Sequence, residues 1–246
     1  MKKLYLFANW KMYLGVAESE KLARAFGKIS NPKGSEIVIF PSALAMSTAA
    51  PIFKKNKFLF GAQNIHWSDH GGFTGEVSVA MYKELGCTHA LVGHSERRRL
   101  FHESDQDVRL KLEAILDEKI IPVLCVGETL EERKAGKVEE VLEKQLQSAY
   151  ANLLLPKGIG LIVAYEPVWA IGTGESCDSE EAERIAGFIS ELVKKITGQT
   201  PVVLYGGSVS AENIRNYINQ PNIQGVLVGG ASAAKESWSE LIEKLT

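Results

Sequence analysis

The sequence alternates eight times between a short apolar run and a longer segment of helical character, and this alternation constrains the fold more than any other feature. Strands that alternate with helices form the parallel sheet of an α/β fold, because each helix returns the chain to the end where the next strand starts. Eight such units in 246 residues match the size of a closed (β/α)8 barrel, which would be one domain spanning residues 1–246. An open doubly wound sheet is the alternative, since closure leaves no mark in a sequence. The predicted strands are Leu4–Ala8, Glu36–Phe40, Phe58–Ala62, Thr88–Gly93, Ile120–Val126, Leu161–Glu166, Pro201–Tyr205 and Gly225–Val228.

Local chemistry marks several ends of the predicted helices. The helix after the fifth strand carries many charges and is broken near Gly136. After the sixth strand, Ser179 is the predicted N-cap of a helix that has acidic residues in its first turn and Lys194 and Lys195 in its last. The final helix is expected to run to Leu245.

Composition excludes several classes of protein. Hydrophobic residues make up 45% of the chain and charged residues 24%, as in a soluble globular protein with a large core. The net charge is -2, which gives no indication of a nucleic-acid partner, and no stretch approaches the length of a transmembrane helix. The three cysteines, Cys87, Cys125 and Cys177, are too few for a disulfide framework and form no CxxC metal motif, so we expect them to be structural. We therefore expect a cytoplasmic protein without a metal or a membrane partner.

The stretch Ala164–Glu175, AYEPVWAIGTGE, combines a carboxylate with an unusual loop. Glu166 ends the sixth predicted strand, and Pro167 stops it because proline has no N–H to continue the pairing. An apolar tip and a Gly-rich segment follow. Such a loop is typical of a lid over a site, and a carboxylate directly before a lid is a candidate general base. The alternative is a loop packed permanently on a neighbour, with Glu166 in a salt bridge; this stretch alone does not decide between the two.

Further polar residues fall at the ends of predicted strands. Asn9 and Lys11 follow the first strand, His94 follows the fourth and Glu166 ends the sixth. The carboxyl ends of the strands meet at one rim of a barrel, and that rim carries the site in barrels of this kind. A lysine, a histidine and a carboxylate brought to one rim by three strands indicate a catalytic site.

His94 and Lys11 each have a structural and a catalytic interpretation. His94 begins a helical turn, whose positive end opposes protonation and favours a neutral imidazole that can donate a hydrogen bond to a carbonyl oxygen; alternatively, it only caps the helix. Lys11 could hold negative charge on a substrate oxygen, or be a solvated lysine paired with an acid, for which Glu96 is a plausible partner. Asn9 could bind the same substrate oxygen or cap the strand.

Two Gly-Gly turns are candidates for phosphate binding. One follows the seventh strand and leads into Ser208, and the other is Gly229-Gly230 after the eighth. Backbone N–H groups in such turns bind anions without a basic side chain, and a phosphate site after strands seven and eight recurs in these barrels. One such turn means little, but two on adjacent strands, with Gly172 of the loop nearby, indicate phosphate. GTGES lacks the ending of a P-loop, so nucleotide binding has little support.

Five motifs together resemble the triosephosphate isomerase family, in order and over essentially the whole chain. The resemblance implies a TIM barrel that interconverts dihydroxyacetone phosphate and D-glyceraldehyde 3-phosphate through an enediol(ate), without a cofactor. The motifs are ANWKM (8–12), GHSERR (93–98), AYEPVWAIGTG (164–174), YGGSV (205–209) and LVGGAS (227–232).

The resemblance also implies a role for each site residue. It makes Glu166 the base, His94 the electrophile and Lys11 the electrostatic stabiliser, with Asn9 in support; this division of labour is known for the family and is not deduced from the residues. The loop after Glu166 would close over the enediolate, which loses phosphate when exposed to water. The implied substrate-binding residues are Asn9, Lys11, Gly172, Ser208, Gly229 and Gly230.

The segment GGFTGEVS, residues 71–78, is similar to the family's interdigitating dimer loop, so we expect a homodimer. The aromatic content of this loop indicates an interface independently. The sequence departs from the family pattern at three places: Tyr13-Leu14 replaces the usual Asn-Gly, His102 replaces a usual Gly, and Ala233 replaces a common Leu. None of these changes removes a candidate catalytic residue.

Two other functions stay open on the residues alone. One is another phosphate-binding barrel isomerase, such as a sugar-phosphate or amino-sugar isomerase of tryptophan or histidine synthesis, but such an enzyme has no reason to carry EPVWAIGTG. The other is a non-catalytic binding protein on the same fold. A protein that had evolved from an enzyme and lost its activity would be expected to lack Lys11, His94 or Glu166, and all three are present.

Overall fold

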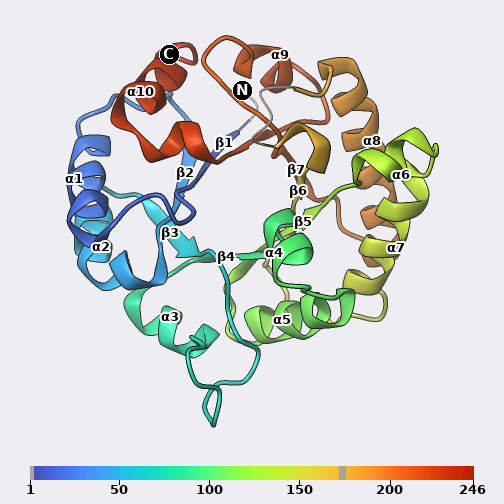
Figure 1. Cartoon of the computed structure of the whole chain (residues 1–246), viewed down its shortest axis with the longest axis horizontal. Coiled ribbons are helices and arrows are strands. Elements are labelled where there is room, and N and C mark those ends of the chain that lie inside the picture. Colours follow the sequence, from blue (N-terminus) through green and yellow to red (C-terminus); the bar gives the residue numbers. More distant parts are fainter. Residues whose placement is uncertain (1–2, 172–175) are drawn as a thin grey trace.

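The computed structural model describes residues 3–171 and 176–246, and its strands form a closed parallel barrel. The strands pair in chain order, and β8 returns to pair with β1 (Figure 1). This closure confirms the predicted (β/α)8 barrel and excludes the open sheet. The strands are β1 (Leu4–Asn9), β2 (Ser35–Phe40), β3 (Leu59–Ala62), β4 (His89–Val92), β5 (Ile121–Val126), β6 (Ile162–Tyr165), β7 (Val202–Tyr205) and β8 (Gly225–Val228).

Helices surround the barrel as an outer ring (Figure 1). Short 3-10 helices follow β6 and β8 at the carboxyl ends of those strands. The helices are α1 (Val16–Phe26), α2 (Ala43–Lys55), α3 (Val79–Leu85), α4 (Ser95–Leu100), α5 (Asp105–Asp117), α6 (Leu130–Lys134), α7 (Val138–Tyr150), η1 (Val168–Ala170), α8 (Ser179–Thr197), α9 (Ile214–Ile218), η2 (Gly230–Ala233) and α10 (Lys235–Glu243).

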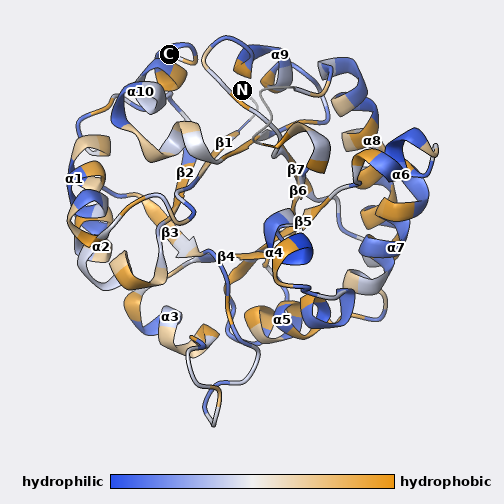
Figure 2. Cartoon of the chain, viewed as in Figure 1, coloured by the Kyte–Doolittle hydropathy of each residue, from blue (hydrophilic) through white to orange (hydrophobic). Residues whose placement is uncertain are grey.

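The strands are apolar on both faces because both faces are buried. In β1, Phe7 belongs to the cluster that fills the barrel, whereas Leu6 and Ala8 belong to the cluster between the sheet and the helices. Strands covered on both sides read as continuous apolar runs, which is why the sequence reveals them so clearly. In Figure 2 the strands are mostly orange, while the helices carry both colours. The interior cluster contains Phe7, Val38, Phe40, Leu91, Val123, Cys125, Ile162, Ala164, Leu204 and Leu227.

Most predicted helix boundaries agree with the structure, and one prediction was wrong. Gly136, at a φ of 70°, separates α6 from α7 as the sequence indicated. The N-cap of α8 is Asp178 and not Ser179: its carboxylate accepts hydrogen bonds from the backbone N–H groups of Glu180 and Glu181 at 2.9 and 3.3 Å. A carboxylate also complements the positive end of the helix, so the helix starts at Ser179, one residue earlier than a serine cap would require.

The segment between β3 and α3 projects away from the barrel (Figure 1). Within it, the ring of His66 lies between two aromatic rings, 4.4 Å from that of Trp67 and 4.2 Å from that of Phe73. This stacking stiffens the base of the projection, and Phe73 stays 44% exposed. An exposed aromatic ring on a projecting loop is a feature of contact surfaces.

Candidate active site

The structure brings together four of the residues that the sequence singled out. Asn9 ends β1 and Lys11 follows it, His94 follows β4, and Glu166 follows β6, so that all four reach the carboxyl rim of the barrel. They line one cavity of about 60 Å³ at the mouth of the barrel. Asn9, His94 and Glu166 are buried, so their polar groups act in an environment poor in water.

Two glycines make room for Glu166. Its backbone N–H donates to the carbonyl of Val126 at 2.7 Å, which fixes the residue beyond the end of β6. A Cβ at Gly127 would lie 1.8 Å from the carbonyl oxygen of Glu166, and a Cβ at Gly206 would lie 2.9 Å from its Cγ. Any side chain at Gly127 would therefore displace Glu166. No motif in the sequence marks Gly127 for this function, and Gly206 was expected only to form part of a phosphate-binding turn.

The carboxylate of Glu166 is held between the backbone of Ser95 and the ring of His94. Its Oε2 accepts a 2.8 Å hydrogen bond from the N–H of Ser95, and its Oε1 lies 3.2 Å from Nε2 of His94. Nδ1 of His94 accepts a hydrogen bond from the N–H of Glu96 at 3.2 Å. Because Nδ1 is an acceptor, Nε2 carries the ring proton and faces the carboxylate. His94 therefore caps α4 and also presents a donor to the cavity.

Lys11 is fixed at both its side chain and its backbone. Its Nζ lies 2.6 Å from Oε1 of Glu96, which confirms the partner expected from the sequence. Its φ is 48°, a left-handed conformation unusual for lysine, and its N–H donates to Oδ1 of Asn9 at 3.0 Å while its carbonyl accepts from Gln63 at 2.9 Å. Burial alone would raise the pKa of Glu96, but the hydrogen bond and charge of Lys11 outweigh it, and the net shift is downward. No motif in the sequence pointed to Gln63.

A buried ion-pair network lies behind His94. Glu103 accepts hydrogen bonds from the N–H of Gly93 at 3.0 Å, from Nε of Arg97 at 2.5 Å and from Nζ of Lys111 at 2.5 Å. Burial opposes ionisation of Glu103, but the charges and hydrogen bonds of Lys111 and Arg97 prevail and lower its pKa. The network ties the turn before His94 to α5, and no local sequence pattern revealed it.

The predicted phosphate residues differ in how they meet the cavity. Ser208 and Gly229 line it, but both the N–H and the hydroxyl of Ser208 donate to the carbonyl of Ala170, at 3.0 and 2.6 Å. Gly230 is not among the lining residues. Gly172 lies outside the described residues.

The start of the loop after Glu166 is anchored by Glu128, a carboxylate that is fully buried. Glu128 accepts a hydrogen bond from Nε1 of Trp169 at 2.8 Å and one from the hydroxyl of Tyr165 at 3.1 Å, and its carbonyl accepts from the N–H of Val168 at 3.0 Å. Over this part, the loop packs on a neighbour, as the alternative interpretation required. The side chain of Glu166 contacts His94 and the N–H of Ser95, and within the described ranges no lysine or arginine is in ion-pair contact with it.

Cys125 lies beneath the site but is no candidate nucleophile. Burial, and then the neighbouring carboxylate of Glu166, raise the pKa of its thiol well above the ordinary value. The thiol therefore stays protonated and inert, as the structural interpretation predicted. In residues 3–171 and 176–246, no group of histidine, cysteine and acidic side chains could hold a metal ion, and no helix is long and apolar enough to cross a membrane.

Comparison with known proteins decides the family. A family model described as triosephosphate isomerase matches residues 4–245. The chain belongs to the triosephosphate isomerase family. The triosephosphate isomerases of Dictyoglomus thermophilum and Picosynechococcus sp. are 38% and 41% identical to it, over 99% and 98% of this chain and 100% and 99% of their own. That of Alkaliphilus metalliredigens is 37% identical over 98% of this chain and 99% of its own.

One departure from the pattern of triosephosphate isomerases puts a non-glycine residue in a strained backbone conformation. His102 stands where the sequence analysis noted a usual glycine, and its φ is 55°. Glycine adopts this left-handed conformation freely, whereas a residue with a Cβ is strained there. The strain is carried next to Glu103, whose three hydrogen bonds fix the chain at that point.

Proposed function

We propose that the chain interconverts dihydroxyacetone phosphate and D-glyceraldehyde 3-phosphate through an enediol(ate), with Glu166 as the base. The proposal rests on one observation above all: Lys11, His94 and Glu166 come from three different strands and line one cavity at the carboxyl rim. Family membership supports the same reaction. The chemistry needs no cofactor, since a hydrogen moves between two carbons of one molecule.

The geometry supplies each element of such a proton transfer. Glu166 takes a proton from the carbon next to the substrate carbonyl and returns it to the neighbouring carbon. The Nε2–H of His94, beside that carboxylate, donates to the substrate oxygens, and Lys11 stabilises the negative charge that develops on them. Asn9 uses its carbonyl oxygen to bind the N–H of Lys11, which directs its amide group to the substrate as a donor.

The phosphate group of the substrate would bind beside β7 and β8. Gly229 lies against the side chain of Lys11, where its backbone and the ammonium group can serve one anion. Ser208 would exchange its hydrogen bonds to Ala170 for bonds to the phosphate, and Gly230 and Gly172 would contribute their N–H groups.

We also propose that the chain acts as a homodimer in the cytoplasm, within glycolysis and gluconeogenesis. The projecting loop carries the exposed ring of Phe73, and Met12, Tyr13 and Leu44 are also large exposed apolar side chains, at 95%, 60% and 77% exposure. Apolar surface of this kind is normally covered by a partner. All three cysteines are free and buried, which suits a reducing compartment.

The proposal is tested by following isomerisation of glyceraldehyde 3-phosphate by the purified chain in the presence of a metal chelator. We expect fast turnover, inhibited competitively by 2-phosphoglycolate, a mimic of the enediolate that carries a phosphate. A folded protein that produced no dihydroxyacetone phosphate would contradict the proposal and favour a binding protein on the same fold.

A further inference from the structure

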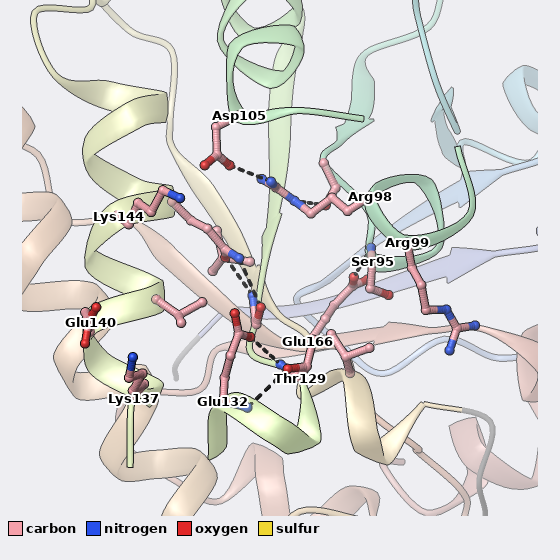
Figure 3. Close-up of a pocket in the computed structure, with 16 residues that line it drawn as sticks. Ser95, Arg98, Arg99, Asp105, Thr129, Glu132, Lys137, Glu140, Lys144 and Glu166 are labelled. Atoms are coloured by element: carbon pink, nitrogen blue, oxygen red, sulfur yellow. Dashed lines mark hydrogen bonds and ion pairs between the residues drawn. The ribbon is translucent and has the colours of Figure 1, made fainter. Parts of the chain in front are cut away.

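A second cavity, of about 540 Å³, lies behind Glu166 and is much larger than the one at the barrel mouth. Its walls come from α4, from the segment between β5 and α6, and from α7 (Figure 3). We call it the rear cavity. Its volume falls in the range of sites that bind small molecules, between about 300 and 1,000 Å³.

The rear cavity and the active-site cavity share Glu166 and no other residue of the proposed machinery. Ser95, which holds the carboxylate of Glu166, also lines the rear cavity, and so does Val168, the first residue of η1. Lys11 and Ser208, by contrast, line only the active-site cavity. A molecule in the rear cavity would therefore touch Glu166 from behind without occupying the place of the substrate.

Most acidic groups around the rear cavity are already engaged by protein donors. Asp105 lies 2.6 Å from Nη1 of Arg98, and the carboxylate of Glu132 accepts a 2.8 Å hydrogen bond from the N–H of Thr129 (Figure 3). Glu166 accepts its bond from Ser95. Of these carboxylates, Asp105 is paired with a cation, whereas Glu132 and Glu166 accept hydrogen bonds from backbone N–H groups.

The lysines of the rear cavity are not engaged in this way. Lys137 and Lys144 lie along α7 on one side, and neither ammonium group has an ion-pair or hydrogen-bond partner among the residues that the structure describes (Figure 3). Glu140 lies on the same face of the helix and also lines the cavity. An anionic group of a ligand placed beside Lys137 and Lys144 would gain ion-pair contacts that the described part of the protein does not itself supply to them.

Part of the lining of the rear cavity is apolar. Val126 ends β5, Val141 projects from α7, and Val168 begins η1, and all three line the cavity. A lining that joins apolar side chains to two lysines fits an amphipathic organic anion, because the body of the ligand is removed from water while its charge stays near the lysines.

We propose that the rear cavity binds a small molecule with an apolar body and one anionic group, and that its occupancy lowers turnover by holding Glu166 against Ser95. The second half of this inference rests on the proposed function, in which Glu166 must reach the substrate as the base. A ligand packed behind the carboxylate stabilises its hydrogen bond to Ser95 and opposes that movement. Because the substrate site stays empty of the ligand, the effect falls on kcat rather than on KM.

Naphthalene-2-sulfonate is a suitable probe, since it joins an apolar ring system to a single anion. Calorimetry on the full chain, with inorganic phosphate present to fill the substrate's phosphate site, should show binding of one molecule per chain. The double variant K137Q/K144Q should bind about tenfold more weakly, as expected for the loss of two exposed charge interactions. The matched control K194Q/K195Q, in the last turn of α8, should bind like the wild type. Absence of binding, or equal binding by K137Q/K144Q, would overturn the site.

Steady-state kinetics test the effect on Glu166. With the wild type, the probe should lower kcat and leave KM for glyceraldehyde 3-phosphate unchanged, and the effect should weaken with K137Q/K144Q. A rise in KM at constant kcat would place the probe in the active site and contradict the inference. Turnover without the probe tests the proposed function by itself, and calorimetry needs no activity, so the two failures are distinguishable.

Discussion

The ammonium group of Lys11 lies 2.6 Å from the carboxylate of Glu96, although 85 positions separate the two residues in the chain. The pair joins the end of β1 to the first turn of α4 across the mouth of the barrel. It fixes the direction of the lysine side chain before any substrate arrives, and preorganised charge of this kind stabilises charge that develops in a reaction.

Glu96→Gln should therefore lower kcat/KM on the order of tenfold without unfolding the protein. The neutral amide no longer holds the ammonium group, and small displacements of a catalytic group carry large rate penalties. Steady-state kinetics on the purified variant measure the loss. The control is Glu118→Gln, which breaks a similar 2.6 Å pair with Lys83 on the outer helices and should leave kcat/KM unchanged. Equal activity of the two variants would show that the pair does not position Lys11.

Lys111→Met should destabilise the fold by about 3 kcal/mol, because it leaves Glu103 buried with one cation fewer. The double variant Lys111→Met/Glu103→Leu should be less destabilised than the sum of the two single changes, since it removes the stranded charge. Urea unfolding measures the change in the free energy of unfolding for Lys111→Met, for Glu103→Leu and for the double variant. The exposed pair of Arg184 with Glu181 is the comparison, and its loss should cost less than about 1 kcal/mol. If the destabilisation of the double variant equalled the sum of those of the two single variants, Lys111 and Glu103 would not be energetically coupled.

The sequence predicted the barrel because its strands are buried on both faces and its turns use recognisable residues. It also predicted the partner of Lys11, because Glu96 and Lys11 both follow strand ends and such ends meet at one rim. Residues whose contacts are with distant parts of the chain could not be predicted from the sequence. Gln63, which follows β3, and Glu103, which lies between α4 and α5, hold parts of the chain that are distant in sequence, and no local periodicity marks such contacts. Gly127 is required by the closeness of another backbone, which only the assembled barrel defines.

The protein should become less stable as the pH falls, because of His89. This residue begins β4 and is buried. Its ring is 1% exposed, lies 5.4 Å from that of Phe7, and its Nε2 has no hydrogen-bond partner among the described residues. Burial, and then the charge of Lys3, lower its pKa to about 3, even though Glu36 lies 3.7 Å away. The stabilisation is complete above the unfolded pKa of about 6.5 and is lost as the pH falls from there towards 3, by at most about 1.4 kcal/mol per pH unit.

Urea unfolding at pH 7 and pH 5 measures this contribution. The wild type should lose about 2 kcal/mol more between these pH values than His89→Gln, which cannot take up the proton. His70→Gln, at an exposed histidine, is the control and should behave like the wild type. The same pH dependence in His89→Gln and the wild type would show that the buried ring does not titrate in this way.

Thr74→Arg should weaken the proposed homodimer. Thr74 is exposed and follows Phe73 in the projecting loop, and burying a charge there without a partner is costly. Sedimentation velocity over a range of concentrations should show more monomer than in the wild type. Thr200→Arg introduces the same side chain at an exposed position before β7 and should leave association unchanged. An identical profile for Thr74→Arg and the wild type would place the interface elsewhere.

The most direct test of the account is the turnover of Glu166→Asp with glyceraldehyde 3-phosphate, measured beside its thermal unfolding. Shortening the side chain retracts the carboxylate by about an ångström while keeping its charge, a shift that can cost on the order of a hundredfold in rate. The account predicts a loss of that order with an unfolding transition close to that of the wild type. Turnover close to the wild-type value in the folded variant would show that Glu166 is not the group that removes the proton.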